Sequence, residues 1–165
     1  MLVIVLVSSP APLAAADFGL PLSVAELTAR AIFVVLGRVV TTESGWDTAR
    51  PLIVTRVDLV VDEILKGPVP GKMLSLRELG GKVGEAASVV ADAPLFAPGE
   101  RVLVFLTFSR DGRLHVVGLH QGKFSLEHLD GGEEMAVRRR PGSAAVLDQT
   151  ALEAVKHAIA AGSPQ

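Results

Sequence analysis

Residues 52–65 read LIVTRVDLVVDEIL and show the clearest alternation of side-chain character in the chain. One face carries apolar or β-branched side chains at every second position: Ile53, Thr55, Val57, Leu59 and Val61. The opposite face carries Arg56, Asp58 and Asp62. A period of two over this length predicts a long β-strand with one buried and one solvated face.

Further strands are predicted on both sides of this segment. Residues 32–42 are rich in β-branched side chains and precede it. Residues 72–79 follow it and alternate, with Leu74 and Leu76 on the inward face. Residues 101–109, RVLVFLTFS, are apolar on both faces and predict the most buried strand.

Hairpins are indicated in the second half of the chain. The Asp111-Gly112 pair is a strong turn signal before a returning strand at residues 113–119. Residues 122–129 and 133–139 predict another strand pair, and a Pro-Gly pair at 141–142 then predicts the end of the β region. We therefore predict a mainly β fold, a small closed antiparallel OB-like Greek-key barrel of five to seven strands.

Helices are predicted at both ends of this β region, each after a capping box. Ser23 and Glu26 predict a short helix over residues 24–30. Thr150 and Glu153 predict a C-terminal helix. The apolar stripe of that helix consists of Leu152, Val155 and Ile159, with Ala158 as a candidate fourth member.

The residues from 80 to 99 lack a regular pattern. A Gly-Gly pair opens this stretch and a Pro-Gly pair closes it, so we predict a long loop. Loops of this length are uncommon in compact domains and are often functional. Residues 83–96 of this loop are therefore a second candidate binding surface.

The first sixteen residues are predicted to be a cleaved secretory signal peptide. Residues 2–7 form an unbroken apolar run, and alanines at 14 and 16 fit a small-residue cleavage site. A buried N-terminal strand is the alternative interpretation. After cleavage, residues 17–143 are predicted to form the barrel domain, and residues 144–165 a C-terminal helix packing on it with a short tail. No later stretch is apolar for long enough to span a membrane, so we predict a secreted or periplasmic protein.

Composition excludes several classes of protein. The 165 residues include no cysteine, which rules out a disulfide scaffold and a zinc site built from thiolates. The net charge of −2 argues against a protein that coats nucleic acid and against a polybasic membrane binder.

Three segments carry a family resemblance: residues 29–39 (ARAIFVVLGRV), 57–67 (VDLVVDEILKG) and 98–106 (PGERVLVFL). In this order they resemble netrin-like domains, whose best-known members are the tissue inhibitors of metalloproteinases. The resemblance covers roughly residues 24–110 and implies an OB-like barrel. In those inhibitors the N-terminal cysteine chelates the zinc of the protease. This chain has no cysteine, so the resemblance implies the fold and no inhibitory residue.

Trp46 is the single tryptophan and lies in the sequence Gly45-Trp46-Asp47, which we predict to be in the loop between the first two strands. OB barrels bind through this loop and through the loop between their fourth and fifth strands. An exposed tryptophan is a common binding anchor. The other interpretation is that Trp46 folds down to cap the end of the barrel. Gly45, Trp46 and Asp47 are the candidate binding residues.

Catalytic chemistry has weak support in the sequence. His115, His120 and His128 fall within fourteen residues and offer a metal site if paired strands bring them together; otherwise they are scattered surface histidines. No nucleophile motif of the G-x-S-x-G type and no phosphate-binding loop is present. We predict neither an enzyme nor a cofactor.

The run Arg138-Arg139-Arg140 has two interpretations. It is either an anion-binding patch or a set of charges that protects an edge strand from pairing with other chains. The second interpretation is favoured, because the acidic chain has too few aromatic residues to bind a nucleic-acid strand.

The sequence therefore predicts an exported, monomeric, non-catalytic protein-interaction module. Its partner is an unidentified protein, with a secreted protease as one candidate and nucleic acid excluded. Two alternatives remain: a metal-dependent hydrolase that uses His115, His120 and His128, and a structural subunit of a cell-envelope assembly.

Overall fold

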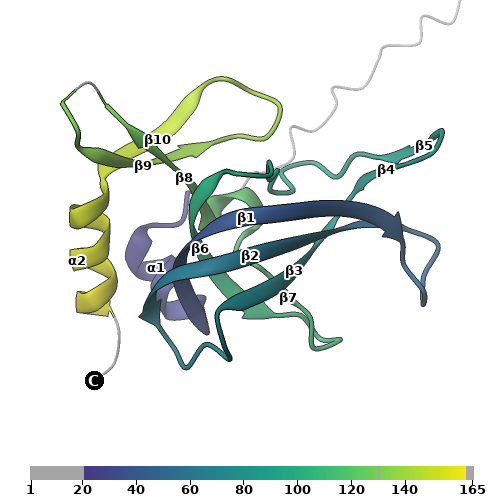
Figure 1. The fold of residues 1–165 in the computed structure, drawn as a ribbon, viewed down its shortest axis with the longest axis horizontal. Helices are drawn as coiled ribbons and strands as arrows, with labels where there is room; N and C mark the ends of the chain where they lie inside the picture. Colours follow the sequence, from purple (N-terminus) through teal and green to yellow (C-terminus); the bar gives the residue numbers. More distant parts are fainter. Residues whose placement is uncertain (1–20, 130, 163–165) are drawn as a thin grey trace, which may run out of the picture.

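The computed structural model describes residues 21–129 and 131–162. Within these ranges the fold is mainly β, with ten strands, two α-helices and one 3₁₀ helix (Figure 1). Neither α-helix in the described ranges is long and apolar enough to cross a membrane. The predicted signal peptide, residues 1–16, lies outside the described residues.

The elements follow in chain order: α1 (Val24–Arg30), β1 (Phe33–Trp46), β2 (Ile53–Lys66), β3 (Met73–Leu79), β4 (Gly81–Val83), β5 (Ala86–Ser88), β6 (Arg101–Phe108), β7 (Leu114–Val116), the 3₁₀ helix (Leu119–Gly122), β8 (Lys123–His128), β9 (Glu134–Arg139), β10 (Val146–Ala151) and α2 (Leu152–Gly162).

Eight of these strands form one mixed sheet in the order β1-β2-β3-β7-β6-β8-β9-β10, and β1 also pairs with β6. All neighbours in the sheet are antiparallel except β3 and β7, which are parallel and share the single residue pair Leu76 and Leu114. The strands β4 and β5 form a separate hairpin at the opposite end of the molecule from α2 (Figure 1).

The mainly β class and the two flanking helices are confirmed, but the closed antiparallel barrel of five to seven strands is not. One residue pair between β3 and β7 gives too few ladder hydrogen bonds to close the sheet there. The strands β8, β9 and β10 also continue the sheet past β6. The result is a mixed sheet of eight strands.

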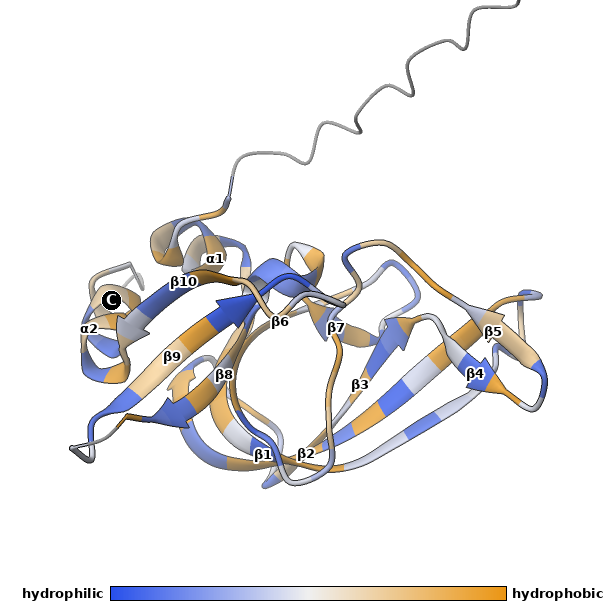
Figure 2. Cartoon of the chain, turned by 90° about the horizontal axis from the view of Figure 1, so that it is seen from above, coloured by the Kyte–Doolittle hydropathy of each residue, from blue (hydrophilic) through white to orange (hydrophobic). Residues whose placement is uncertain are grey.

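The central strand β6 is buried on both faces, as predicted. Its side chains alternate between two apolar cores, with Leu103 and Phe105 in one and Val102, Val104 and Leu106 in the other. All five are fully buried, and each such side chain stabilises the fold by about 1.5–3 kcal/mol. Figure 2 shows the alternation of hydrophilic and hydrophobic residues along β3, which by contrast has one wet face.

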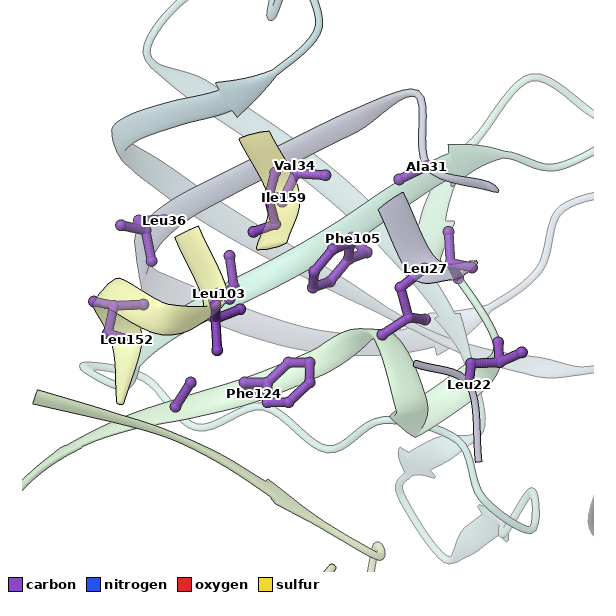
Figure 3. Packing of buried hydrophobic residues seen from close by; sticks show 13 residues of the cluster. Leu22, Leu27, Ala31, Val34, Leu36, Leu103, Phe105, Phe124, Leu152 and Ile159 are labelled. Carbon is purple, nitrogen blue, oxygen red and sulfur yellow. The ribbon is translucent and has the colours of Figure 1, made fainter. Parts of the chain in front are cut away.

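The first core lies between the sheet and the two helices. Figure 3 shows Phe105 with Leu27 of α1 on one side and Ile159 of α2 on the other. The predicted apolar stripe of α2 is confirmed, since Leu152, Val155 and Ile159 are all buried. The second core lies inside the curve of β1, β2, β3 and β6 and includes Leu59 and Leu76.

The predicted capping box of α1 is confirmed. The amide of Ser23 donates to the carboxylate of Glu26 at 2.8 Å, and the amide of Glu26 donates to the Ser23 hydroxyl at 3.3 Å. The second capping box is wrong. Thr150 lies in β10 and its hydroxyl donates to Asp148, while α2 begins only at Leu152.

Two further strand predictions are corrected. The β region does not end at residues 141–142, because β10 follows and pairs with β9. The stretch from 80 to 99 is not entirely loop, because it contains the hairpin of β4 and β5. The three missed strands, β4, β5 and β10, are short and have little apolar alternation, so their pairing depends on neighbours that the local pattern does not reveal.

The Lys66-Gly67 pair fixes the position of β2 against α1. The Lys66 ammonium donates to the carbonyls of Thr28 at 2.5 Å and Ala31 at 2.8 Å, where α1 ends. Gly67 has a φ of +83°, and a Cβ there would lie 2.2 Å from the carbonyl oxygen of Ile32. Only glycine fits this position without a shift of the backbone.

Candidate functional site

A cleft of about 420 Å³ lies where β1 ends, against β2, β3 and the turn between β6 and β7. We call it the Trp46 cleft, and define it by its aromatic and charged lining residues: Trp46, Asp47, Arg56, Arg77, Phe108 and Arg113. These residues come from β1, β2, β3, β6 and two loops. The antiparallel pairing of β1 with β2 and β2 with β3 brings them together.

Trp46 and Phe108 give the Trp46 cleft an accessible aromatic surface. Trp46 is the last residue of β1 and pairs with Ile53, so the prediction that it lies in the loop is wrong by one residue. Trp46 is 55% exposed and Phe108 is 47% exposed. Such exposure shows that Trp46 is not a buried cap on the end of the sheet.

Asp47 lines the cleft but has an internal role. Its Oδ1 accepts hydrogen bonds from the amides of Ala49 at 2.7 Å and Arg50 at 3.2 Å, which folds the loop that follows β1. Its Oδ2 forms an ion pair with the guanidinium of Arg77. Asp47 therefore shapes the loop and orients Arg77. Gly45 lies opposite Val54 in the ladder and does not line the cleft.

Two of the three arginines in the Trp46 cleft are held by carboxylates. Arg77 contacts Asp47 and also lies 3.5 Å from Asp111. Arg56 lies 2.8 Å from Glu43 and 3.5 Å from Asp58. The hydrogen bond from Ser109 lowers the pKa of Asp111, and the neighbouring arginines lower it further, so this carboxylate stays ionised.

Arg113 differs from the other two arginines. Its side chain is exposed on the turn after β6, and within residues 21–129 and 131–162 its guanidinium has no hydrogen-bond or ion-pair partner. The charged side chains that line the cleft are three arginines and one aspartate, a formal charge of +2. Because Glu43, Asp58 and Asp111 lie beside Arg56 and Arg77, Arg113 is the cleft arginine whose charge no carboxylate of the described residues balances.

A second cleft of about 290 Å³ adjoins the first, and both share Arg77 and Arg113. We call it the Glu78 cleft, after the buried carboxyl that lines it. Glu78 is only 5% exposed and its Oε1 accepts a hydrogen bond from the amide of Val116 at 2.8 Å. Burial raises the pKa of Glu78 to about 8, so the side chain is mostly protonated at neutral pH.

The three histidines do not form a site. His115 lies in β7, His120 is buried in the 3₁₀ helix beside Asp92, and His128 lies exposed at the end of β8. Burial lowers the pKa of His120. In the described part of the chain, no group of three or more potential metal ligands comes together.

The three consecutive arginines have separate partners. Arg138 is buried; it donates to the carbonyl of Leu22 at 2.9 Å and lies over the ring of Phe124. Arg139 pairs with Glu127 across the sheet. The interpretation as protection of an edge strand is wrong, because β9 pairs with β8 and β10.

The residues that sequence reasoning missed in the two clefts are Arg56, Arg77, Glu78, Phe108 and Arg113. Four of them come together only through strand pairing, which no local pattern reveals. Glu78 had a local signal, since it continues the inward alternation of Leu74 and Leu76.

Comparison with known proteins gives no further guide. No protein-family model matches the chain, and no curated protein matches it either.

Proposed function

We propose that this chain is a non-catalytic protein-interaction module and that the Trp46 cleft is its contact site. One observation carries the proposal: an accessible tryptophan and phenylalanine border a cleft that also presents the exposed guanidinium of Arg113. Aromatic and arginine side chains at the centre of a contact provide most of its binding energy in many interfaces.

We also propose that the sheet is a partly open variant of the OB arrangement. The support is the cycle of pairings from β1 through β2, β3, β7 and β6 back to β1. OB folds bind ligands on the face of their second and third strands and with two loops, which join strands one to two and four to five. The Trp46 cleft is lined by the equivalent strands β2 and β3, by residues after β1, and by the turn between β6 and β7.

An exported, monomeric protein remains part of the proposal, and its support is the signal-like pattern of residues 1–16. The resemblance to netrin-like domains supports a secreted protease as the first class of partner to test. Since the chain has no cysteine, any inhibition would have to come from surface contact and not from chelation of the zinc of a protease.

The test is affinity capture from periplasmic and culture extracts. The bait proteins are the unaltered chain, Trp46→Ala, and the matched control Leu147→Ala, which removes a half-exposed apolar side chain from β10, away from the cleft. We expect a specific partner to bind the unaltered chain and the control and to be lost with Trp46→Ala. A partner that Trp46→Ala retains would place the contact elsewhere.

A further inference from the structure

We infer that the ligand of the Trp46 cleft is a short peptide segment with an acidic side chain between two apolar ones. This inference rests on the proposed function, since it names the chemistry of the partner at the same site. It depends on the order in which apolar and charged groups lie along the two adjoining clefts.

The two clefts present apolar surface at both ends and arginines between them. Trp46 and Phe108 line the first cleft, and Leu79 and Leu119, both about half exposed, line the second. The residues common to both clefts are Arg77 and Arg113. A ligand that occupies both clefts therefore places its middle beside these arginines.

Arg113 is the group that selects the charge of that middle position. Arg77 already faces Asp47 and Asp111, and Arg56 faces Glu43 and Asp58. Arg113 has no such partner in the described part of the chain. Because a guanidinium binds a carboxylate with two parallel hydrogen bonds, one aspartate or glutamate of the ligand completes the arrangement.

A peptide fits these observations better than a nucleic-acid strand. Single strands bind through a series of phosphate contacts and stacked bases along a positive groove. Here the carboxylates already neutralise Arg56 and Arg77, so one arginine is available where such a strand needs several. A single carboxylate matches a single available guanidinium.

The test is a peptide array in a glycine–serine frame, in which the three central residues are apolar, variable and apolar. The variable residue is glutamate, aspartate, glutamine or lysine. The labelled probes are the unaltered protein, Trp46→Ala, Arg113→Gln, and Arg110→Gln as the matched control. Arg110 is an exposed arginine in the same turn that lines neither cleft.

We expect binding to spots with a central glutamate or aspartate, lost with Trp46→Ala. For the best acidic peptide, Arg113→Gln should weaken binding by about tenfold or more, as expected for a lost charge-assisted hydrogen bond, and Arg110→Gln should leave it unchanged. Because Trp46 is the only tryptophan and the chain has no tyrosine, its fluorescence reports directly on occupancy of the cleft during titration.

Three outcomes would overturn the inference. Trp46-dependent binding without preference for an acidic residue, or without an effect of Arg113→Gln, removes the charge assignment and leaves the proposed function standing. Binding of a labelled oligothymidine that Trp46→Ala abolishes, with no peptide bound, shows a nucleic-acid site and overturns both proposals. An array without any Trp46-dependent spot contradicts the peptide ligand, and the affinity capture then decides the proposed function separately.

Discussion

Glu78 of β3 accepts a hydrogen bond from the backbone amide of Val116 of β7, with 2.8 Å between Oε1 and the nitrogen. The two strands otherwise share the single residue pair Leu76 and Leu114. The side chain of Glu78 therefore joins β3 to β7 beyond the point where the ladder stops. The junction of β3 and β7 includes residues that line both clefts. The protonation state of Glu78 therefore affects the stability of the region around the two clefts.

The first prediction concerns the dependence of stability on pH. Burial raises the pKa of Glu78 in the folded protein to about 8, from 4.5 in the unfolded chain. Between these values the folded state binds more protons than the unfolded state. Its free energy of unfolding therefore falls as pH rises, by at most about 1.4 kcal/mol per pH unit. Urea denaturation between pH 5 and pH 8.5 measures this slope.

Glu78→Gln is the variant that isolates this effect. Its amide oxygen can still accept from Val116 but does not titrate, so we expect a flatter stability profile and a gain in stability at pH 8.5 relative to the unaltered chain. Glu85→Gln, which changes an exposed carboxylate in the turn between β4 and β5, should leave the slope as it is. Equal slopes for the unaltered chain and Glu78→Gln would contradict the assignment.

The second prediction concerns Asp47. Asp47→Ala removes both the acceptor for the amides of Ala49 and Arg50 and the carboxylate that faces Arg77. We expect a loss of about 1–3 kcal/mol in the free energy of unfolding, because two loop amides and the partly buried guanidinium of Arg77 lose their partner. The emission spectrum of the adjacent Trp46 should shift as the loop loosens.

Asp47→Asn provides the control for this prediction. Its amide oxygen can keep the bonds to the loop amides, while the charge that faces Arg77 is lost. An intermediate stability is therefore expected. If Asp47→Ala were as stable as the unaltered chain, with an unchanged Trp46 spectrum, Asp47 would not organise the loop.

The elements that the sequence predicted well are those whose pattern is local and long. The alternation in residues 52–65, the apolar run that became β6, and the capping box of Ser23 and Glu26 are confirmed by β2, β6 and α1. The predictions that were wrong concern elements whose formation depends on pairing with distant strands. β10 forms by pairing with the edge of β9. Thr150 therefore lies in this strand and not at the N-cap of a helix.

The same distinction applies to the candidate site. Trp46 and Asp47 could be chosen from composition and loop chemistry, and both line the cleft. Arg77, Phe108 and Arg113 could not be chosen, since they reach the cleft only through the register of β2 with β3 and the turn after β6. A charged run such as residues 138–140 misleads because strand alternation sends adjacent side chains to opposite faces.

The third prediction concerns Gly67, which positions β2 against α1. Gly67→Ala forces a Cβ against the carbonyl oxygen of Ile32 in a backbone conformation with a φ of +83°. We expect a loss of at least about 1–3 kcal/mol in the free energy of unfolding, measured by urea denaturation. Gly71→Ala is the matched control, since Gly71 also has a positive φ but meets nothing within 4 Å. A similar loss for both variants would mean that backbone strain alone, and not the contact with Ile32, causes the effect.

The fourth prediction separates the roles of Arg138 and Arg139. Arg138 is buried among the carbonyl of Leu22, the carboxylate of Asp148 and the ring of Phe124. Replacing it with alanine leaves these groups without their partner, so Arg138→Ala should lower the free energy of unfolding by about 3–5 kcal/mol.

Arg139→Ala is the matched control for Arg138, because Arg139 makes a partly exposed ion pair with Glu127 on β8. Solvent and salt screen such a pair, so the loss should stay below about 1 kcal/mol and should shrink in 1 M salt, whereas the loss for Arg138→Ala should persist there. Urea denaturation at low and high salt measures both. Equal losses for the two variants, or a loss for Arg138→Ala that salt removes, would show that Arg138 acts as a surface charge and not as a buried link between β9 and the residues that precede α1.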